Sequence, residues 1–112
     1  LDLVEINADT KSLGTKISGC PHSNNSGCYR PGIDAGFLIP GSDYLYEFHP
    51  ATGESKEIVS WLSCNINGSN VQSVSAGPEG KLYVFTNDYS GEDNKYELII
   101  LEKKQLHGDL NY

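Results

Sequence analysis

The chain lacks several features, and each lack argues against a class of protein. Among its 112 residues no apolar run approaches the roughly 18 residues of a membrane-spanning helix, so we expect no membrane insertion. Lys and Arg number only 8 against 15 Asp and Glu, which gives a net charge of -7. Because such a surface repels phosphate groups, we expect neither nucleic-acid binding nor attachment to anionic membranes.

Methionine, a basic leader and catalytic motifs are also absent. Met is missing even at position 1, which favours a processed chain or an excerpt from a longer precursor. Residues 1–5 lack the basic start of a signal peptide, so in a secreted protein the signal has already been removed. The sequence holds no G-x-S-x-G nucleophile elbow. We therefore expect no cofactor and no enzyme activity of this chain on its own.

What the sequence does contain is alternation of apolar and polar residues, the pattern of β-strands. The alternating runs cover residues 1–6, 13–17, 44–48, 56–59, 71–74, 81–86 and 96–101. A short buried-type run at 37–39 adds a further strand, Trp61 could extend the run at 56–59, and residues 20–36 form a long loop. We expect a single all-β domain over residues 1–112, built from antiparallel hairpins in about seven to nine strands. Only the tail, 102–110, is a helix candidate.

A short phrase recurs along the chain. Residues 3–11 align with residues 45–53, and a looser third copy begins at Leu82. Each copy is an alternating strand that runs into turn-forming residues. A period near 40 residues is typical of repeat architectures such as propellers.

Two further stretches match each other and point to a family. Residues 41–48 read GSDYLYEF, and residues 77–85 read GPEGKLYVF. With the PATGE turn at 50–54, they resemble β-propeller blade hairpins of the secreted sugar-dehydrogenase-like type. At roughly 40–45 residues per blade the resemblance implies about 2.5 propeller-type units, fewer than the four to eight of a closed ring. The chain would then belong to a larger or oligomeric propeller; the alternative fold is a small β-sandwich or roll.

Three cysteines and two glycosylation motifs bear on the compartment. Cys20 and Cys28 bracket a segment of turn formers, and we expect a disulfide between them to order it. The spacing also permits either to pair with Cys64. No paired C-x₂₋₄-C knuckle is present, so we expect no metal site there. Asn24 and Asn67 each begin an N-x-[ST] sequon, and these features favour a secreted, extracellular glycoprotein.

Aromatic side chains are the predicted ligand- and partner-binding residues, because they combine an apolar face with a hydrogen-bonding tip. The candidates are Tyr29, Tyr44, Tyr46, Trp61 and Tyr89. Two acidic features compete with them. Asp88, Glu92 and Asp93 offer oxygen ligands for Ca²⁺ but lack the EF-hand spacing. Glu47 and His49 could form a general-base pair, although a solvated polar face is the favoured interpretation.

These observations predict an extracellular, non-catalytic binding or interaction module. It would complete a larger assembly with a protein partner or second chain, or bind a glycan. The first alternative is a fragment or subunit of a secreted β-propeller enzyme. The second is a small secreted inhibitor or toxin-like protein that presents the segment between Cys20 and Cys28.

Overall fold

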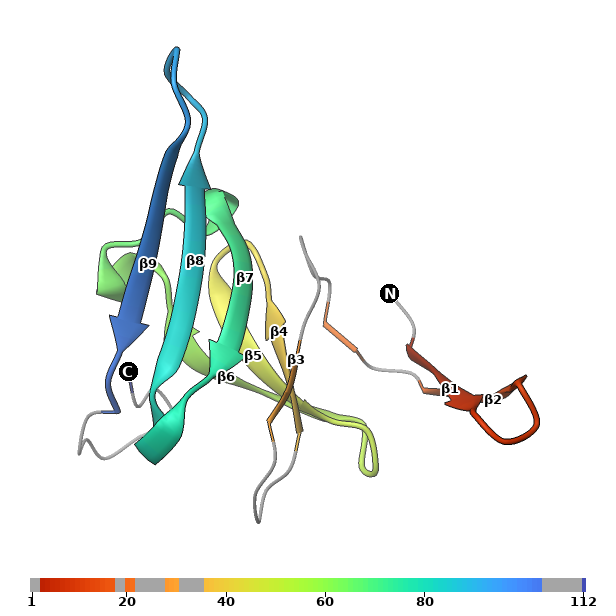
Figure 1. The fold of residues 1–112 in the computed structure, drawn as a ribbon. Helices are drawn as coiled ribbons and strands as arrows, with labels where there is room; N and C mark the ends of the chain where they lie inside the picture. Colours follow the sequence, from red (N-terminus) through yellow and green to blue (C-terminus); the bar gives the residue numbers. More distant parts are fainter. Residues whose placement is uncertain (1–2, 18–19, 22–27, 31–35, 104–111) are drawn as a thin grey trace.

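The chain folds into three antiparallel sheets (Figure 1). The computed structural model describes residues 3–17, 20–21, 28–30, 36–103 and 112. The hairpin sheet consists of β1 (Leu3–Asn7) and β2 (Ser12–Ile17). The four-stranded sheet has the order β3 (Cys28–Arg30), β4 (Gly36–Pro40), β5 (Tyr44–His49) and β6 (Glu54–Ser60). The three-stranded sheet has the order β7 (Val71–Ala76), β8 (Leu82–Asp88) and β9 (Lys95–Leu101). The predicted all-β fold of antiparallel hairpins is confirmed.

Three short 3-10 helices lie in the connections between strands. They are η1 (Leu62–Cys64), η2 (Gly68–Asn70) and η3 (Pro78–Gly80). In the part of the chain that the structure describes, no helix has the length and apolar character needed to cross a membrane. The predicted tail helix falls mostly on residues 104–111, outside the described residues.

The hydrophobic core lies between the four-stranded and the three-stranded sheets. Leu38, Leu45 and Val59 face it from one sheet, and Val71, Leu82 and Val84 face it from the other. Trp61 and Ile66, from the connection between the sheets, fill the space between them. This layered packing follows from the alternation in the sequence, because every second residue of a strand points to the same face.

The turn between β5 and β6 shows how local chemistry fixes the hairpin register. Gly53 adopts a left-handed conformation, with φ 75°, and its N–H donates to the carbonyl oxygen of His49 at 2.9 Å. Glycine reaches this conformation without steric cost. The predicted turn at 50–53 is therefore confirmed.

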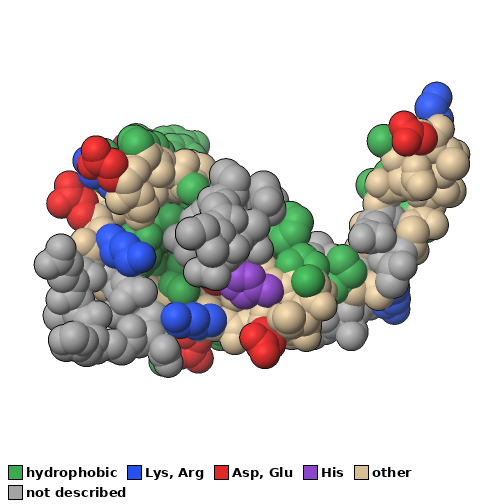
Figure 2. All heavy atoms as spheres, turned by 90° about the horizontal axis from the view of Figure 1, so that it is seen from below, with side chains coloured by type: hydrophobic (Ala, Val, Ile, Leu, Met, Phe, Trp, Pro, Cys, Tyr) green, Lys and Arg blue, Asp and Glu red, His purple; other side chains and the backbone are tan. Residues whose placement is uncertain are grey.

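The β1–β2 hairpin is the least covered part of the structure. Figures 1 and 2 show it projecting from the body formed by the other two sheets. Ile6 pairs with Leu13 across the two strands, and both side chains are exposed, with Val4 exposed as well. A turn stabilised by Asn7, whose side-chain oxygen accepts the N–H groups of Asp9 and Thr10, joins the strands.

Two sequence-based expectations need correction. The long loop predicted over 20–36 contains the short strand β3, which sequence reasoning missed because only three residues form it. The strand predicted to continue through Trp61 ends at Ser60, since Trp61 takes helical dihedral angles. The third copy of the repeated phrase falls on β8, the central strand of its sheet. The described residues form no closed ring, so the propeller relation stays a prediction.

Candidate functional site

The three-stranded sheet carries an apolar surface on the side turned away from the core, which we call the outer face. It consists of Tyr83, Phe85, Tyr96, Leu98 and Ile100. Tyr83 lies opposite Ile100 and Phe85 opposite Leu98, so these four side chains stand on one side of β8 and β9. Leu98 is 63% exposed and Ile100 is 54% exposed.

The aromatic rings of the outer face are ordered against each other. Phe85 and Tyr96 stack with their ring centroids 5.9 Å apart and their planes 16° from parallel. Such pairs stabilise a surface beyond the area they bury. Yet Tyr96 remains 60% exposed. The outer face is therefore preorganised and apolar, and it is open to solvent.

One buried polar atom lies at the end of β8, beside this surface. Asn87 follows Phe85 by two residues on the same side of the strand, and Tyr96 is its cross-strand neighbour. Within the described residues its side-chain oxygen is buried with no hydrogen-bond partner. An unsatisfied buried acceptor is costly and uncommon in folded proteins.

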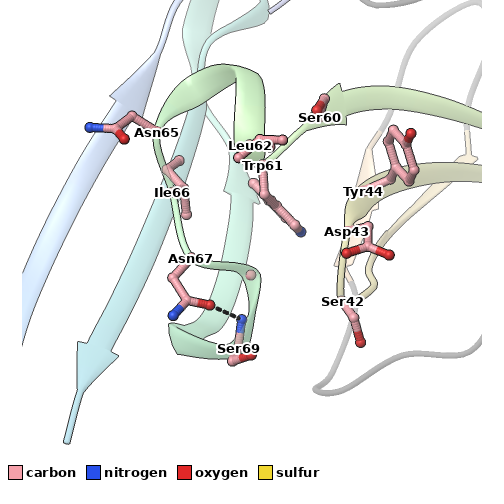
Figure 3. Close-up of a pocket in the computed structure, with 11 residues that line it drawn as sticks. Ser42, Asp43, Tyr44, Ser60, Trp61, Leu62, Asn65, Ile66, Asn67 and Ser69 are labelled. Carbon is pink, nitrogen blue, oxygen red and sulfur yellow. Dashed lines mark hydrogen bonds between the residues drawn. The ribbon is translucent and has the colours of Figure 1, made fainter. Parts of the chain in front are cut away.

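A second candidate site is a cleft of about 700 Å³ (Figure 3). One wall is the turn between β4 and β5, with Ser42 and Asp43, followed by Tyr44. The other wall is the connection after β6, with Asn65, Asn67, Ser69 and the exposed Leu62. Hydroxyl, amide and carboxylate groups share the lining with apolar side chains such as Leu62 and Ile66, so the cleft suits a small ligand with both polar and apolar parts.

Hydrogen bonds from Trp61 hold the two walls of the cleft together. Its indole N–H donates to the carbonyl oxygen of Gly41 at 2.9 Å, and its backbone N–H donates to the backbone carbonyl oxygen of Asp43 at 3.1 Å. Gly68 lies against the same residues: a Cβ atom there would overlap the Ser42 carbonyl oxygen and approach the Trp61 ring to 2.7 Å. Glycine is required at this position because of the close approach.

Among the predicted binding aromatics whose side chains the structure describes, Tyr44 and Trp61 both line the cleft, and Tyr46 lies beside Tyr44. Tyr44 lies at the cleft, and its ring centroid is 6.2 Å from that of Tyr46. Burial, followed by the nearby carboxylates of Glu57 and Asp43, raises the pKa of Tyr46. Tyr89 is exposed in the loop between β8 and β9. The Tyr29 side chain lies outside the described residues.

Among the described members of that set, Trp61 is buried, so its expected exposure is wrong. It is 1% exposed and belongs to the core. The indole N–H, the only hydrogen-bonding group of the side chain, already donates to the carbonyl oxygen of Gly41. The indole therefore shapes the floor of the cleft rather than a surface that a partner could reach.

The Glu47–His49 pair also differs from the expectation of a solvated face. Glu47 is 6% exposed, and its Oε1 lies 3.1 Å from Nε2 of His49. Alternation places both side chains on the same side of β5 as the core residue Leu45, not opposite it. The pair is thus a buried contact at the margin of the core.

The acidic loop and the glycosylation motifs are placed only in part. Asp88 accepts hydrogen bonds from the hydroxyl and backbone N–H of Ser90, and these bonds lower its pKa. Among the described residues no group of three potential metal ligands is found. Asn67 lies at the cleft, where its side-chain oxygen accepts from Ser69 N–H at 3.0 Å; Asn24 lies outside the described residues.

The predicted disulfide stays a prediction. No disulfide is present among the side chains that the structure describes, and the side chain of Cys28 is not one of them. Cys64 is half-buried against the hydrophobic core.

Sequence reasoning missed Leu98, Ile100 and Phe85, the aliphatic and aromatic residues of the outer face. A signal for them was present in the run YELIIL, residues 96–101, which is apolar at both parities in its second half. Strands with apolar residues on both faces are typical of sheets covered on both sides.

No protein-family model, curated protein or solved structure matches the chain.

Proposed function

We propose that the chain is a non-catalytic interaction module that binds a protein partner through the outer face of the three-stranded sheet. The observation that carries the proposal is the exposure of Tyr96, Leu98 and Ile100 on one face of one strand. Contiguous exposed apolar patches are uncommon on soluble monomers and mark interaction sites. Aromatic residues are also enriched in protein interfaces.

The partner that fits this surface best is another β-sheet. The inner face of the same three-stranded sheet is already covered by a sheet, through residues such as Leu82 and Val84. A partner sheet on the outer face would add a third layer at the usual spacing of about 10 Å. Neighbouring blades of a propeller contact each other in this way, which supports a larger or oligomeric propeller. The partner could also carry an active site, and the chain would then be a subunit of a secreted enzyme.

The setting we propose is extracellular. The two sequons and the pair Cys20 and Cys28 support it. Asn67 is exposed in the described structure, as a glycan acceptor must be. Treatment of the protein from its source with peptide N-glycosidase should lower its mass; an unchanged mass would contradict the glycoprotein assignment.

Native mass spectrometry of the protein from its source tests partner binding. We expect a complex heavier than the 12.2 kDa chain. The double variant L98K/I100K should release the monomer, because two charges would have to be buried in the interface. The control is Leu62→Lys, which changes a leucine that is even more exposed than Leu98, 89% against 63%, and lies away from the outer face; this variant should keep the complex. A native monomer, or a complex that survives the double variant, would contradict the proposal.

Glycan binding in the cleft is the second candidate function. Tyr44 offers an aromatic surface beside the hydroxyl and amide groups of Ser42, Asn65 and Ser69, and sugars are bound by such combinations. A glycan array with the wild-type chain and Tyr44→Ala tests it. Signal that disappears in the variant would support the candidate, and no signal from the wild type would dispose of it.

A further inference from the structure

The last strand of the three-stranded sheet, β9, is open along the side away from β8. Its seven residues pair with β8 from Lys95↔Asp88 to Leu101↔Leu82. No other strand in the described ranges pairs with it. In an antiparallel pair, alternate residues of an edge strand direct their N–H and C=O groups away from the neighbour. β9 therefore presents a row of available backbone donors and acceptors.

The side chains of β9 are incompletely covered on both faces. Ile99 and Leu101 point toward the core and pack against it, but they are only partly buried. Leu98 and Ile100 point outward and are exposed. Natural edge strands are usually protected by charges, prolines or bulges, and the second half of β9, from Leu98 to its end, has none of them. The second half of β9 therefore has the apolar composition of an interior strand, although β9 lies at the edge of its sheet.

The four-stranded sheet shows what an interior strand of this kind looks like when covered. β3 and β7 each begin their sheet, and β7 packs beside β3 and β4. β9 is the third strand of its sheet counted from β7, and β5 is the third strand counted from β3, so β9 corresponds to β5. Beyond β5 the four-stranded sheet continues with β6, and Leu45 and Phe48 of β5 are completely buried. β9 has no such neighbour among the described residues.

We propose that β9 accepts one further antiparallel strand, supplied by the protein partner, so that binding occurs by β-augmentation. This inference rests on the proposed function and specifies the occupant as an extended polypeptide segment. The model for that segment is β6, which buries Val59 against the core while its first four residues stay exposed. The incoming strand should likewise carry apolar residues at its core-facing positions.

Charge adds a second requirement for the incoming strand. The loop that leads into β9 contains Asp88, Glu92 and Asp93 and is exposed at its tip. A strand that runs antiparallel to β9 ends beside this loop. Lys or Arg near its C-terminal end would match the acidic loop and favour one direction of docking.

A synthetic peptide with the β6 sequence and the following tryptophan, residues 54–61 (ESKEIVSW), extended by one lysine at its C-terminus to meet the acidic loop, is the probe. Hydrogen exchange of the complete chain is followed by NMR with and without peptide. We expect about tenfold slower exchange at alternate amides of β9, because hydrogen bonding to a new strand protects them. The same peptide N-methylated at alternate residues is the control, and it should protect none of them. The amides of the β1–β2 hairpin provide an internal reference.

Two results would overturn the inference. One is unchanged exchange of β9 at millimolar peptide; the other is equal protection by the N-methylated peptide, which cannot form the ladder. If β9 is unprotected while the native complex still depends on Leu98 and Ile100, the partner covers the outer face without adding a strand, and only β-augmentation fails. If the complex is also absent, the proposed function fails with it. Protection of β9 by a second copy at high concentration would support augmentation and identify the chain as its own strand donor.

Discussion

The two faces of the three-stranded sheet are built from the same strands, yet they differ completely in how they are covered. On β8, Leu82 and Val84 face inward and are fully buried. Phe85, the residue after Val84, faces outward and is 38% exposed. On β9 the exposed outward residues Leu98 and Ile100 are as apolar as the inward Ile99 and Leu101. On β9, composition therefore does not distinguish the faces. The difference is that the inner face has a sheet packed on it, and the outer face is open to solvent.

The largest expected effect comes from the floor of the cleft, where the inner packing is most complete. Trp61→Ala removes a fully buried ring and its hydrogen bond to Gly41. We expect a loss of about 3–5 kcal/mol in the free energy of unfolding, measured by urea denaturation. Leu62→Ala is the control one residue away, at 89% exposure; it should change stability by less than about 0.5 kcal/mol. Similar losses in the two variants would contradict the assigned burial.

The comparison of the two faces is tested directly by Leu82→Ala and Leu98→Ala. Truncation of the inward Leu82 should lower the free energy of unfolding by about 2–5 kcal/mol, because it leaves a cavity between the sheets. The outward leucine should cost less than about 1 kcal/mol in the isolated chain. Thermal and urea unfolding of both variants measures this. If Leu98→Ala destabilises the monomer as much as Leu82→Ala does, the outer face is already covered by the chain itself.

Two glycines extend the comparison from side chains to the backbone. Gly68→Ala places a methyl group against the Ser42 carbonyl and the Trp61 ring, and we expect a loss of about 1–3 kcal/mol from overpacking. Gly91, in the loop before β9, has open space around it, and Gly91→Ala should be close to neutral. Urea denaturation provides both values. A neutral Gly68→Ala would show that the turn at Ser42 is free to move.

A smaller effect is expected where the end of the chain meets the core. The hydroxyl of Tyr112 donates to the carbonyl oxygen of Gly80, and the ring belongs to the core cluster. Tyr112→Phe keeps the ring and removes the hydrogen bond, so about 1 kcal/mol should be lost. The exposed Tyr89 supplies the control, Tyr89→Phe, with no expected change. Equal stability of both variants would show that the hydrogen bond contributes nothing.

The smallest effect concerns the acidic loop. Hydrogen bonds from Ser90 lower the pKa of Asp88 below its ordinary value of 3.8. A depressed folded-state pKa contributes stability above the unfolded value, and that contribution is lost as the pH falls through the folded value. Ser90→Ala should raise the pKa of Asp88 and flatten the acid limb of the stability curve. NMR titration of the Asp88 carboxyl measures the shift, and an unchanged pKa would contradict the assigned cause.

The strands and hairpins could be predicted from sequence because they depend on local signals. Alternation from Tyr44 to Phe48 and the glycine at position 53 are sufficient to place β5, its turn and β6. The three-residue strand β3 is too short to show a period. It is held by pairing with β4, which is a contact that no local pattern reports.

The candidate site could be predicted less well, for a physical reason. Alternation tells which residues share a face, but the cover on that face comes from a distant part of the chain. Glu47 is buried on the same face of β5 as the core residue Leu45, and Trp61 is buried because the connection after β6 turns inward. Leu98 and Ile100 lie in a strand that is apolar on both faces, and this pattern indicates an exposed apolar surface more directly than the tyrosines do.

Carbene footprinting read out by mass spectrometry tests the central claim most directly, since it labels exposed side chains residue by residue. In the dilute monomer we predict strong labelling of Tyr96, Leu98 and Ile100 and almost none of Leu82 and Val84. In the complex isolated from the source, labelling of the first three should fall to the level of the inner face. Protection of the outer face in the monomer, or equal labelling of it in monomer and complex, would contradict the account.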